Sequence, residues 1–300
     1  MDLGMIGLGR MGGNMSERLL NAGHRIVVHD LNTAAMDRVA QKGAAKADSL
    51  EALVKLLRPP RAIWIMVPAG NVVEDTLNKL LPLLAADDIV VDGGNSYYKD
   101  TMKRSAAFSA KGIHYVDVGT SGGIWGDREG YCLMIGGNPS AVGHLQPVFE
   151  VLAPALDRGW AHVGPSGAGH FVKMVHNGIE YGLMQAYAEG FAILQKKNDL
   201  VQDVPMIAKL WGNGSVIRSW LLELTAEALA ENPKLEGVRP HVSDSGEGRW
   251  TVAEAVEQNV SAPVITMALL ERLRSRDDEA FADRLLAMLR NKFGGHEVKR

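Results

Sequence analysis

The sequence lacks the features that mark several large protein classes. Its 300 residues include one cysteine, Cys132, so no disulfide can form within the chain. Lysine and arginine total 32 against 35 acidic residues, which gives a formal net charge of −3. Because no long basic tract is present, nucleic-acid binding is not expected. The single cysteine favours a reducing compartment.

No segment combines the length and hydrophobicity of a membrane span. Crossing a bilayer takes about 20 apolar residues, whereas the apolar stretch of residues 3–8 is short and interrupted by glycines. That stretch lacks the basic flank and cleavage site of a secretory signal. We therefore expect a cytoplasmic protein that contacts no membrane. Internal repeats are also missing, and no residue cluster suggests a bound metal.

The composition is typical of a globular protein, and the pattern of apolar residues differs between the two halves of the chain. Hydrophobic residues make up 46% of the sequence. In the first half, short apolar runs alternate with amphipathic stretches, which predicts an α/β fold with a mostly parallel sheet covered on both faces. Strands are expected at residues 3–6, 25–29, 62–67, 89–91, 113–118, 132–135 and 161–163. Helices between them include residues 11–21, 71–84 and 100–110.

Helical periodicity replaces this alternation after Gly164-Pro165-Ser166-Gly167. Helices are expected at residues 168–197, 203–211, 216–231, 252–259, 263–276 and 279–290. We place the domain boundary at Pro165. A Rossmann-type dinucleotide-binding domain then spans residues 1–164, and an all-helical domain spans residues 165–300.

A glycine-rich turn follows the first expected strand. The segment Gly7-Leu8-Gly9-Arg10-Met11-Gly12 has the GxGxxG spacing and opens a helix. The first glycine permits a tight turn, the second lets backbone approach a pyrophosphate, and the third allows close helix packing. The helix N-terminus offers N–H groups to phosphates. Because strand and helix flank the motif, we interpret it as a dinucleotide site rather than a structural turn.

Asp30 ends the second expected strand, about 20 residues after the glycines, where an acid binds the adenosine ribose hydroxyls. A carboxylate there also repels the 2′-phosphate of NADP, and the following Leu31-Asn32-Thr33 contains no arginine to attract it. NAD is therefore the expected cofactor, with NADP as the weaker alternative. The other interpretation of Asp30 is a cap for the next helix.

Two further loops follow expected parallel strands. Val67-Pro68 lies at the end of the strand expected at residues 62–67, and Gly93-Gly94-Asn95-Ser96 follows the strand expected at residues 89–91. Ligands bind at the carboxyl ends of strands in such sheets. We expect Val67, Pro68 and Asn95 to contact the cofactor, although both loops also read as ordinary turns.

One expected helix carries a polar stripe among apolar neighbours. Lys173, His176, Asn177 and Glu180 stand at i, i+3, i+4 and i+7 and so share a face. Burying such a stripe is costly unless it faces a ligand. An amine and a carboxyl two turns apart suit acid–base chemistry. A solvated face with a surface ion pair is the alternative, but it would place an acid where Asn177 stands.

Four segments together resemble the 6-phosphogluconate dehydrogenases, and the resemblance runs from the first strand to Arg300. They are the glycine turn, Asp92-Gly93-Gly94-Asn95-Ser96, Gly119-Thr120-Ser121-Gly122-Gly123, and Lys173-Met174-Val175-His176-Asn177-Gly178-Ile179-Glu180-Tyr181. Most are shared with the wider β-hydroxyacid dehydrogenases. The run from His176 to Glu180 is narrower and specific to this family.

The resemblance implies oxidative decarboxylation of 6-phosphogluconate to ribulose 5-phosphate and carbon dioxide, with reduction of NAD, a step of the pentose phosphate pathway. Lys173 would be the general base for the third-carbon hydroxyl. Glu180 would be the acid that protonates the first carbon of the enediol. The residues implied to hold the carboxylate and hydroxyls are Asn95, Ser121, Gly122, Gly123, His176 and Asn177.

The resemblance also implies a phosphate site and an oligomer. Tyr181 and Arg218 would bind the substrate phosphate, and the helical domain would serve substrate binding and dimerisation. Arg290 and His296, near the C-terminus, would reach into the partner subunit's site, so a homodimer or homotetramer is expected. A solvated terminus is the alternative for these two residues.

The chain departs from the family pattern in three places. Longer members have a second helical half that this chain lacks. They also carry a lysine where Ser245 stands, which leaves Ser245 and Arg249 open as phosphate contacts. NADP-using members have an arginine just after the second strand. Two rival functions remain: a dehydrogenase of a small unphosphorylated acid such as 3-hydroxyisobutyrate, and a non-catalytic NAD-binding protein.

Overall fold

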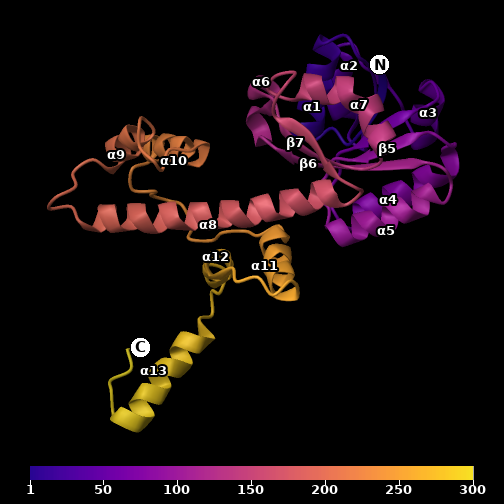
Figure 1. The fold of residues 1–300 in the computed structure, drawn as a ribbon. Coiled ribbons are helices and arrows are strands. Elements are labelled where there is room, and N and C mark those ends of the chain that lie inside the picture. Colours follow the sequence, from indigo (N-terminus) through magenta and orange to yellow (C-terminus); the bar gives the residue numbers. More distant parts are fainter. Residues whose placement is uncertain (300) are drawn as a thin grey trace. The chain divides into compact units, whose positions relative to one another are not determined.

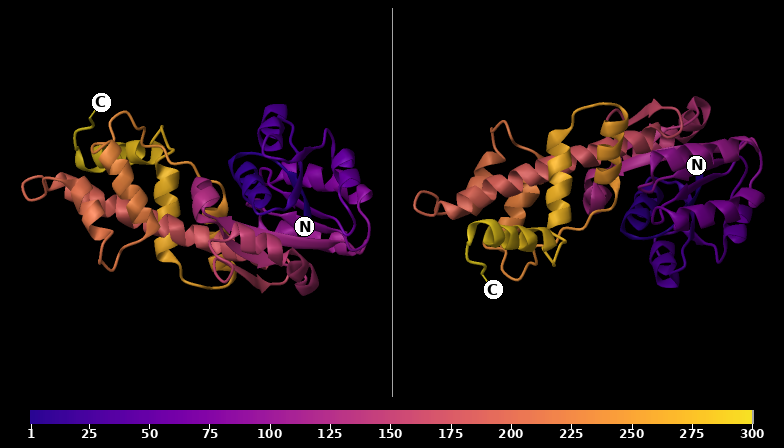
Figure 2. Two further views of the ribbon diagram at one scale, coloured as in Figure 1. Left: turned by 90° about the horizontal axis from the view of Figure 1, so that it is seen from above. Right: turned by 90° about the horizontal axis from the view of Figure 1, so that it is seen from below.

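The computed structural model describes residues 1–299, which form two compact units. The first unit runs from Met1 to His176 and the second begins at Asn177. One long helix, α8 (Ala168–Lys196), contributes residues to both units (Figure 1). The helix is unbroken in two further views (Figure 2).

The first unit contains an eight-stranded sheet in the order β3-β2-β1-β4-β5-β6-β7-β8. Its strands are β1 (Asp2–Ile6), β2 (Arg25–His29), β3 (Ala45–Lys46), β4 (Ala62–Ile65), β5 (Ile89–Asp92), β6 (His114–Ser121), β7 (Cys132–Gly136) and β8 (Trp160–Gly164). All neighbours pair in parallel except β6 and β7. The prediction of a mostly parallel sheet is therefore confirmed; only the two-residue strand β3 was not expected.

Helices cover both faces of this sheet. They are α1 (Arg10–Asn21), α2 (Thr33–Ala40), α3 (Leu50–Leu56), α4 (Asn71–Leu80), α5 (Tyr98–Ser109), α6 (Gly126–Glu129) and α7 (Pro139–Leu152), with short 3₁₀ turns at Leu81–Leu83 and Gly123–Trp125. One core cluster joins α1, α2 and α7 to one face, and a second joins α3, α4 and α5 to the other. Successive residues alternate between the two: Trp64 lies in the first cluster and Ile63 in the second.

The second unit is helical. After α8 come α9 (Val204–Trp211), α10 (Trp220–Glu231), α11 (Glu247–Glu257), α12 (Pro263–Arg274) and α13 (Phe281–Gly294). Helix α10 begins four residues later than expected because the Ser219 side chain caps it by accepting from the Leu222 N–H at 3.1 Å. Helix α11 begins five residues earlier than expected, directly after Gly246. Within residues 1–299, no helix has the length and hydropathy that crossing a membrane requires.

Candidate active site

The glycine turn between β1 and α1 has the geometry that its spacing predicts. Gly7 has φ +91°, and a Cβ there would run into the Met66 carbonyl. A Cβ on Gly12 would meet the Gly7 carbonyl, so close packing requires glycine there too. Gly9 is exposed and has open space around it. Backbone at Gly9 and the first N–H groups of α1 are therefore accessible to a pyrophosphate.

Asp30, which directly follows β2, holds this turn through hydrogen bonds. One carboxylate oxygen accepts a hydrogen bond from the Leu8 N–H at 2.5 Å, and the other accepts from the Asn32 N–H at 2.7 Å. The cap of α2 is Asn32, whose side chain accepts from Ala34 and Ala35. The interpretation of Asp30 as a helix cap is therefore wrong. Leu31, the next residue, is 97% exposed.

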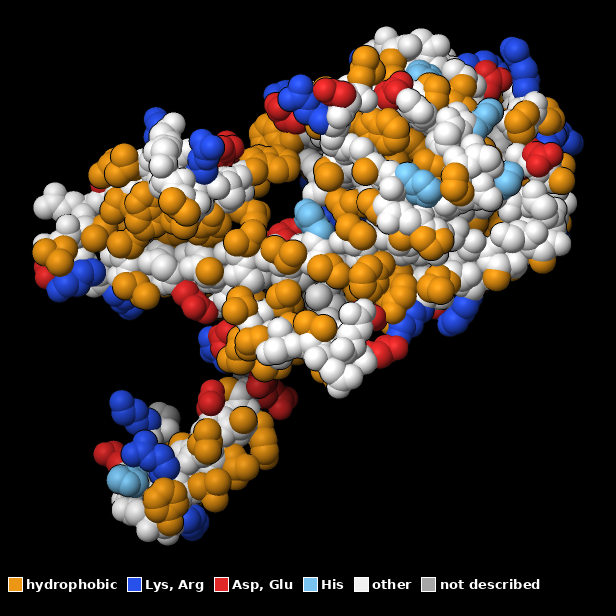
Figure 3. Space-filling model, viewed as in Figure 1, with side chains coloured by type: hydrophobic (Ala, Val, Ile, Leu, Met, Phe, Trp, Pro, Cys, Tyr) orange, Lys and Arg blue, Asp and Glu red, His pale blue; other side chains and the backbone are white. Residues whose placement is uncertain are grey.

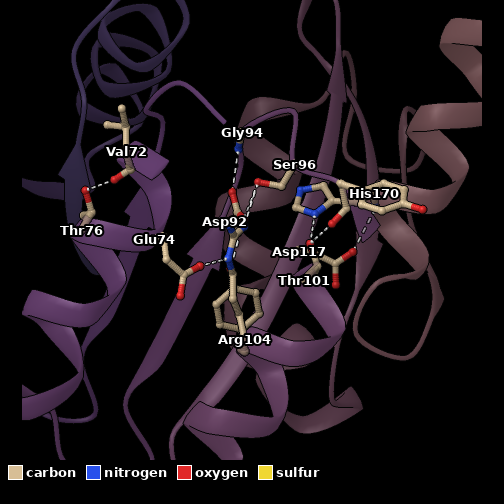
Figure 4. Close-up of polar contacts among 12 residues, drawn as sticks. Val72, Glu74, Thr76, Asp92, Gly94, Ser96, Thr101, Arg104, Asp117 and His170 are labelled. Atoms are coloured by element: carbon tan, nitrogen blue, oxygen red, sulfur yellow. Dashed lines mark hydrogen bonds and ion pairs between the residues drawn. The ribbon is translucent and has the colours of Figure 1, made fainter. Parts of the chain in front are cut away.

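Asp92 organises the loop that carries Asn95. Its carboxylate accepts hydrogen bonds from the Gly94 N–H at 3.1 Å and the Ser96 hydroxyl at 2.8 Å (Figure 4). The Tyr115 hydroxyl donates to the same carboxylate at 3.0 Å. Burial, followed by the nearby Asp92, raises the pKa of Tyr115 well above its ordinary value, so the phenol remains a donor. Asn95 itself is exposed between two residues that Asp92 fixes.

Lys173, His176 and Ser121 come together where β6 meets α8. The Lys173 side chain is buried, with 9% of the residue exposed. Its Nζ lies 3.3 Å from Nδ1 of His176, and Nε2 of the same ring lies 3.4 Å from the Ser121 hydroxyl. Gly122 and Gly123 follow with φ of +132° and +53°. Because the amine lies next to the imidazole and the imidazole next to the hydroxyl, the three groups can bind oxygens of a substrate and exchange protons with them.

The same face of α8 continues through Asn177 and Glu180, and Tyr181 follows Glu180; these residues belong to the second unit. Tyr181 is 6% exposed, and the Arg272 guanidinium of α12 stacks on its ring at 3.6 Å. Gly248 of α11 packs against the same ring, where no Cβ would fit. Arg272 was not among the predicted site residues, and its stacking on Tyr181 makes it a candidate phosphate ligand.

Glu247 is a second residue near Tyr181 that the sequence did not indicate. It is 1% exposed, and the Ser245 hydroxyl donates to its Oε2 at 2.6 Å. Its other carboxylate oxygen is buried and has no hydrogen-bond partner among the described residues. The side chain of Ser245 is thus already engaged within the protein.

Three predicted phosphate ligands are exposed on separate segments. Arg218 lies in the turn before α10, Arg290 in α13, and His296 after it. The turn of Arg218 is held by Tyr187 of α8, whose hydroxyl donates to the Ile217 carbonyl at 2.6 Å and lies 2.9 Å from the Ser219 hydroxyl. Within residues 1–299, no group of three or more acidic, histidine or cysteine side chains is arranged to hold a metal.

Arg249, the other open candidate, pairs with Asp244 at 3.0 Å, and Arg276 approaches the same carboxylate at 2.6 Å. The hydrogen bonds from Arg249 lower the pKa of Asp244 below its ordinary value. Asp244 is 4% exposed at its side chain and links the start of α11 to the end of α12. The ion pair therefore stabilises the region around Tyr181 and Arg272.

We expect Asp244→Asn to lower the melting temperature at pH 7. Because the folded-state pKa is depressed, the stabilisation is complete above the unfolded-state pKa of about 4 and is lost as the pH falls through the lower folded-state value. The difference between variant and wild type should therefore close in acid, as measured by thermal unfolding at several pH values. Asp157→Asn, which removes a pair with Arg158 that is exposed on both sides, is the control and should change little. An equal deficit at all pH values would mean that the charge of Asp244 is not the cause.

Family models match both parts of the chain. The NAD binding domain of 6-phosphogluconate dehydrogenase matches residues 2–164, and the 6-phosphogluconate dehydrogenase C-terminal domain matches residues 169–298. The NAD(+)-dependent, decarboxylating 6-phosphogluconate dehydrogenase of Haloferax volcanii is 50% identical over 302 residues, covering 100% of this chain and 99% of that protein. The chain belongs to the 6-phosphogluconate dehydrogenase family. The resemblance noted in the sequence is thereby confirmed.

Solved structures of related proteins share the fold of this chain. The 6-phosphogluconate dehydrogenase of Plasmodium falciparum has a TM-score of 0.84 and 28% identity, covering 100% of this chain. This chain spans 66% of that longer protein. A 3-hydroxyisobutyrate dehydrogenase of Mycobacterium tuberculosis has a TM-score of 0.73 at 22% identity, covering 93% of this chain and 94% of that one. The latter shows only that the small-acid dehydrogenases share the fold.

Proposed function

We propose that the protein oxidises and decarboxylates 6-phosphogluconate to ribulose 5-phosphate and carbon dioxide, using NAD. The observation that carries the proposal is the buried Lys173 beside His176 and Ser121, on the helix face that continues to Asn177 and Glu180. The 50% identity to an NAD(+)-dependent, decarboxylating relative supports it. The single cysteine fits a reducing compartment, so we place the reaction in the cytoplasm.

The residues of the first unit suit NAD as the cofactor. The glycine turn leaves backbone at Gly9 open and packs α1 closely against β1, as a pyrophosphate site requires. Asp30 would bind the adenosine ribose hydroxyls from its position against Leu8. Arg10, Met11, Val67, Pro68 and Asn95 border the same edge of the sheet. When bound, NAD accepts a hydride from the third carbon of the substrate.

The protein side chains supply the proton transfers. Lys173 as the neutral amine takes the proton of the third-carbon hydroxyl while the hydride leaves that carbon, which yields a 3-keto acid. The carboxylate leaves as carbon dioxide, the electron pair of the breaking bond passes to the ketone oxygen, and the protonated Lys173 returns its proton to that oxygen, which gives the enediol. Glu180 then delivers a proton to the first carbon of the enediol. Ser121, Gly122, Gly123, His176 and Asn177 hold the oxygens of the sugar acid during these steps.

The phosphate end is assigned to cationic and aromatic side chains. Tyr181 and Arg272 stack within the second unit, and Arg218 lies on an ordered turn. Guanidinium groups match phosphate oxygens in pairs. We propose that Arg290 and His296 complete this site in a partner subunit.

An oligomer also accounts for the apolar surface of α13. Hydrophobic side chains gather along this helix and over α9 and α10 (Figure 3). On α13 the large exposed hydrophobic residues are Phe281, Leu285, Leu286, Met288, Leu289 and Phe293. An exposed apolar stripe of this kind marks a protein–protein contact. A second copy of the chain covering it would bring the neighbouring tail to the partner subunit.

Asp30→Ala should raise the KM for NAD about tenfold or more, because hydrogen bonds to a charged group contribute roughly 1.5–3 kcal/mol. It should also reduce discrimination against NADP. Asp30→Asn is the matched control: it keeps an acceptor for the Leu8 N–H and removes the charge. We expect Asn to improve the use of NADP with less damage to NAD binding. Unchanged KM values for both cofactors in both variants would remove Asp30 from the cofactor site.

The deciding experiment incubates the purified protein with 6-phosphogluconate and either NAD or NADP, and follows reduced cofactor together with carbon dioxide. Equal amounts of the two products, formed faster with NAD, would support the proposal. Reduced cofactor without carbon dioxide, or turnover of 3-hydroxyisobutyrate instead, would support the small-acid dehydrogenase. Tight NAD binding with no turnover of any sugar acid would favour a non-catalytic protein.

A further inference from the structure

Strand β6 packs against the first half of α8, and the contacts between them lie at three successive positions along the strand, here called levels. Asp117, Gly119 and Ser121 alternate along β6 and therefore share one face of the strand. At the first level, the Asp117 carboxylate is fully buried and accepts from two N–H groups of the α8 N-terminus: Gly167 at 2.7 Å and His170 at 2.9 Å. This carboxylate fixes how far α8 is shifted along β6 and how it is rotated.

At the second level the two backbones touch. A Cβ on Gly119 would meet the Cβ of Lys173 and would lie 2.6 Å from the Gly169 carbonyl oxygen. From the helix side, a Cβ on Gly169 would lie 2.6 Å from the Asp117 carbonyl oxygen and 2.9 Å from the Gly136 nitrogen. Backbone atoms cannot yield as a flexible side chain can. Gly119 therefore sets the depth at which the first carbon of the Lys173 side chain sits.

The third level is the active-site contact itself, where the Ser121 hydroxyl lies 3.4 Å from His176. A lateral bond secures the assembly: His170 Nδ1 lies 2.7 Å from the Thr101 hydroxyl, which donates to the Tyr97 carbonyl at 3.3 Å (Figure 4). This bond ties α8 to the start of α5, just after the loop of Asn95. Both His170 and Thr101 are buried.

We infer that Asp117 and Gly119 are positioning residues for the amine of Lys173. Neither would touch the substrate; Asp117 sets the register of the helix and Gly119 the depth of the lysine. The inference rests on the proposed function in which Lys173 is the base. A misplacement of about 1 Å at a catalytic group can cost about a hundredfold in rate. A methyl group at position 119 forces a displacement at Lys173 itself.

Gly119→Ala tests the inference against Gly143→Ala, an exposed glycine in α7 with open space around it. We expect Gly119→Ala to lower kcat about a hundredfold, with little change in the KM for 6-phosphogluconate or in the affinity for NAD. The isotope effect on kcat with substrate deuterated at the third carbon should increase, since hydride transfer becomes slower than the other steps. Gly143→Ala should behave as wild type. A kcat within twofold of wild type for Gly119→Ala would overturn the inference.

If Gly119→Ala fails to fold, Asp117→Asn is the second variant that tests the inference. The amide keeps the size of the carboxylate but retains one acceptor oxygen for two N–H donors, so we expect a smaller loss of kcat, about tenfold. Thermal unfolding is measured alongside, and kcat is compared at a temperature well below the melting point of each protein, so that lost stability does not count as lost activity. A kcat within twofold of wild type in folded Asp117→Asn protein would overturn the role of Asp117.

A chemical readout separates this inference from the proposed function. The acetylation rate of Lys173 by acetic anhydride, measured by peptide mass spectrometry relative to the exposed Lys111, requires no turnover. We expect this ratio to change severalfold in Gly119→Ala and to remain constant in Gly143→Ala. An unchanged ratio in Gly119→Ala overturns the inference. Wild-type protein that does not turn over 6-phosphogluconate refutes the proposed function, while the acetylation ratio still tests the positioning of Lys173.

Discussion

Lys173→Met should lower kcat by about a thousandfold or more and leave the affinity for NAD near its wild-type value. Methionine is close to lysine in length, so it fills the buried position and removes only the amine that accepts the hydroxyl proton. Positioned general bases contribute about a hundredfold to ten-thousandfold. The measurements are kcat with 6-phosphogluconate and a fluorescence titration with NAD.

The matched control for this variant is Lys111→Met, which removes an exposed lysine from the same unit. It should leave kcat unchanged. Because methionine is easier to bury than an amine, Lys173→Met should also melt no earlier than wild type. A Lys173→Met protein that keeps more than about a tenth of wild-type kcat would eliminate Lys173 as the base.

The sequence predicts best those structural features that are encoded within one segment. The glycine turn is a local backbone requirement: Gly7 has a positive φ, and Gly12 packs against the Gly7 carbonyl where no Cβ would fit. The polar stripe from Lys173 to Glu180 depends only on the 3.6-residue period of one helix. Asp30 was placed correctly at the end of β2, but its hydrogen bond to Leu8 was not foreseen.

Residues that act across the fold left no such local pattern. Arg272 reaches Tyr181 from another helix, and Asp117 meets His170 from a strand 53 positions away in sequence. No local sequence pattern near either residue predicts these contacts, because they depend on how the elements pack. The start of α11 was missed for a related reason. Its first residues, Glu247 and Gly248, read as a loop, but Gly248 packs directly on the Tyr181 ring and favours the helix there.

Arg290→Ala should raise the KM for 6-phosphogluconate about thirtyfold or more, because removing one partner of a charged hydrogen-bonded pair costs at least about 2 kcal/mol. The variant should barely change the kinetics with gluconate, which lacks the phosphate. The comparison of the two substrates is the measurement, and Arg284→Ala, an exposed arginine on the same helix, is the control. Equal losses with both substrates would mean that Arg290 does not contact the phosphate.

Mixing two defective variants tells whether the tail acts on its own subunit or on the partner. In a heterodimer of the two variants, the Arg290→Ala subunit keeps Lys173 and the Lys173→Met subunit keeps Arg290. If the tail crosses to the partner, these two residues meet in one site, so one of the two sites of the heterodimer is intact. Random reassembly of equal amounts then restores about one quarter of the sites, whereas a tail that serves its own subunit restores none. The assay is run at a low concentration of 6-phosphogluconate, where Arg290→Ala alone has little activity. A mixture no more active than the average of its two components would refute a shared site, because each subunit would then carry its own defect alone.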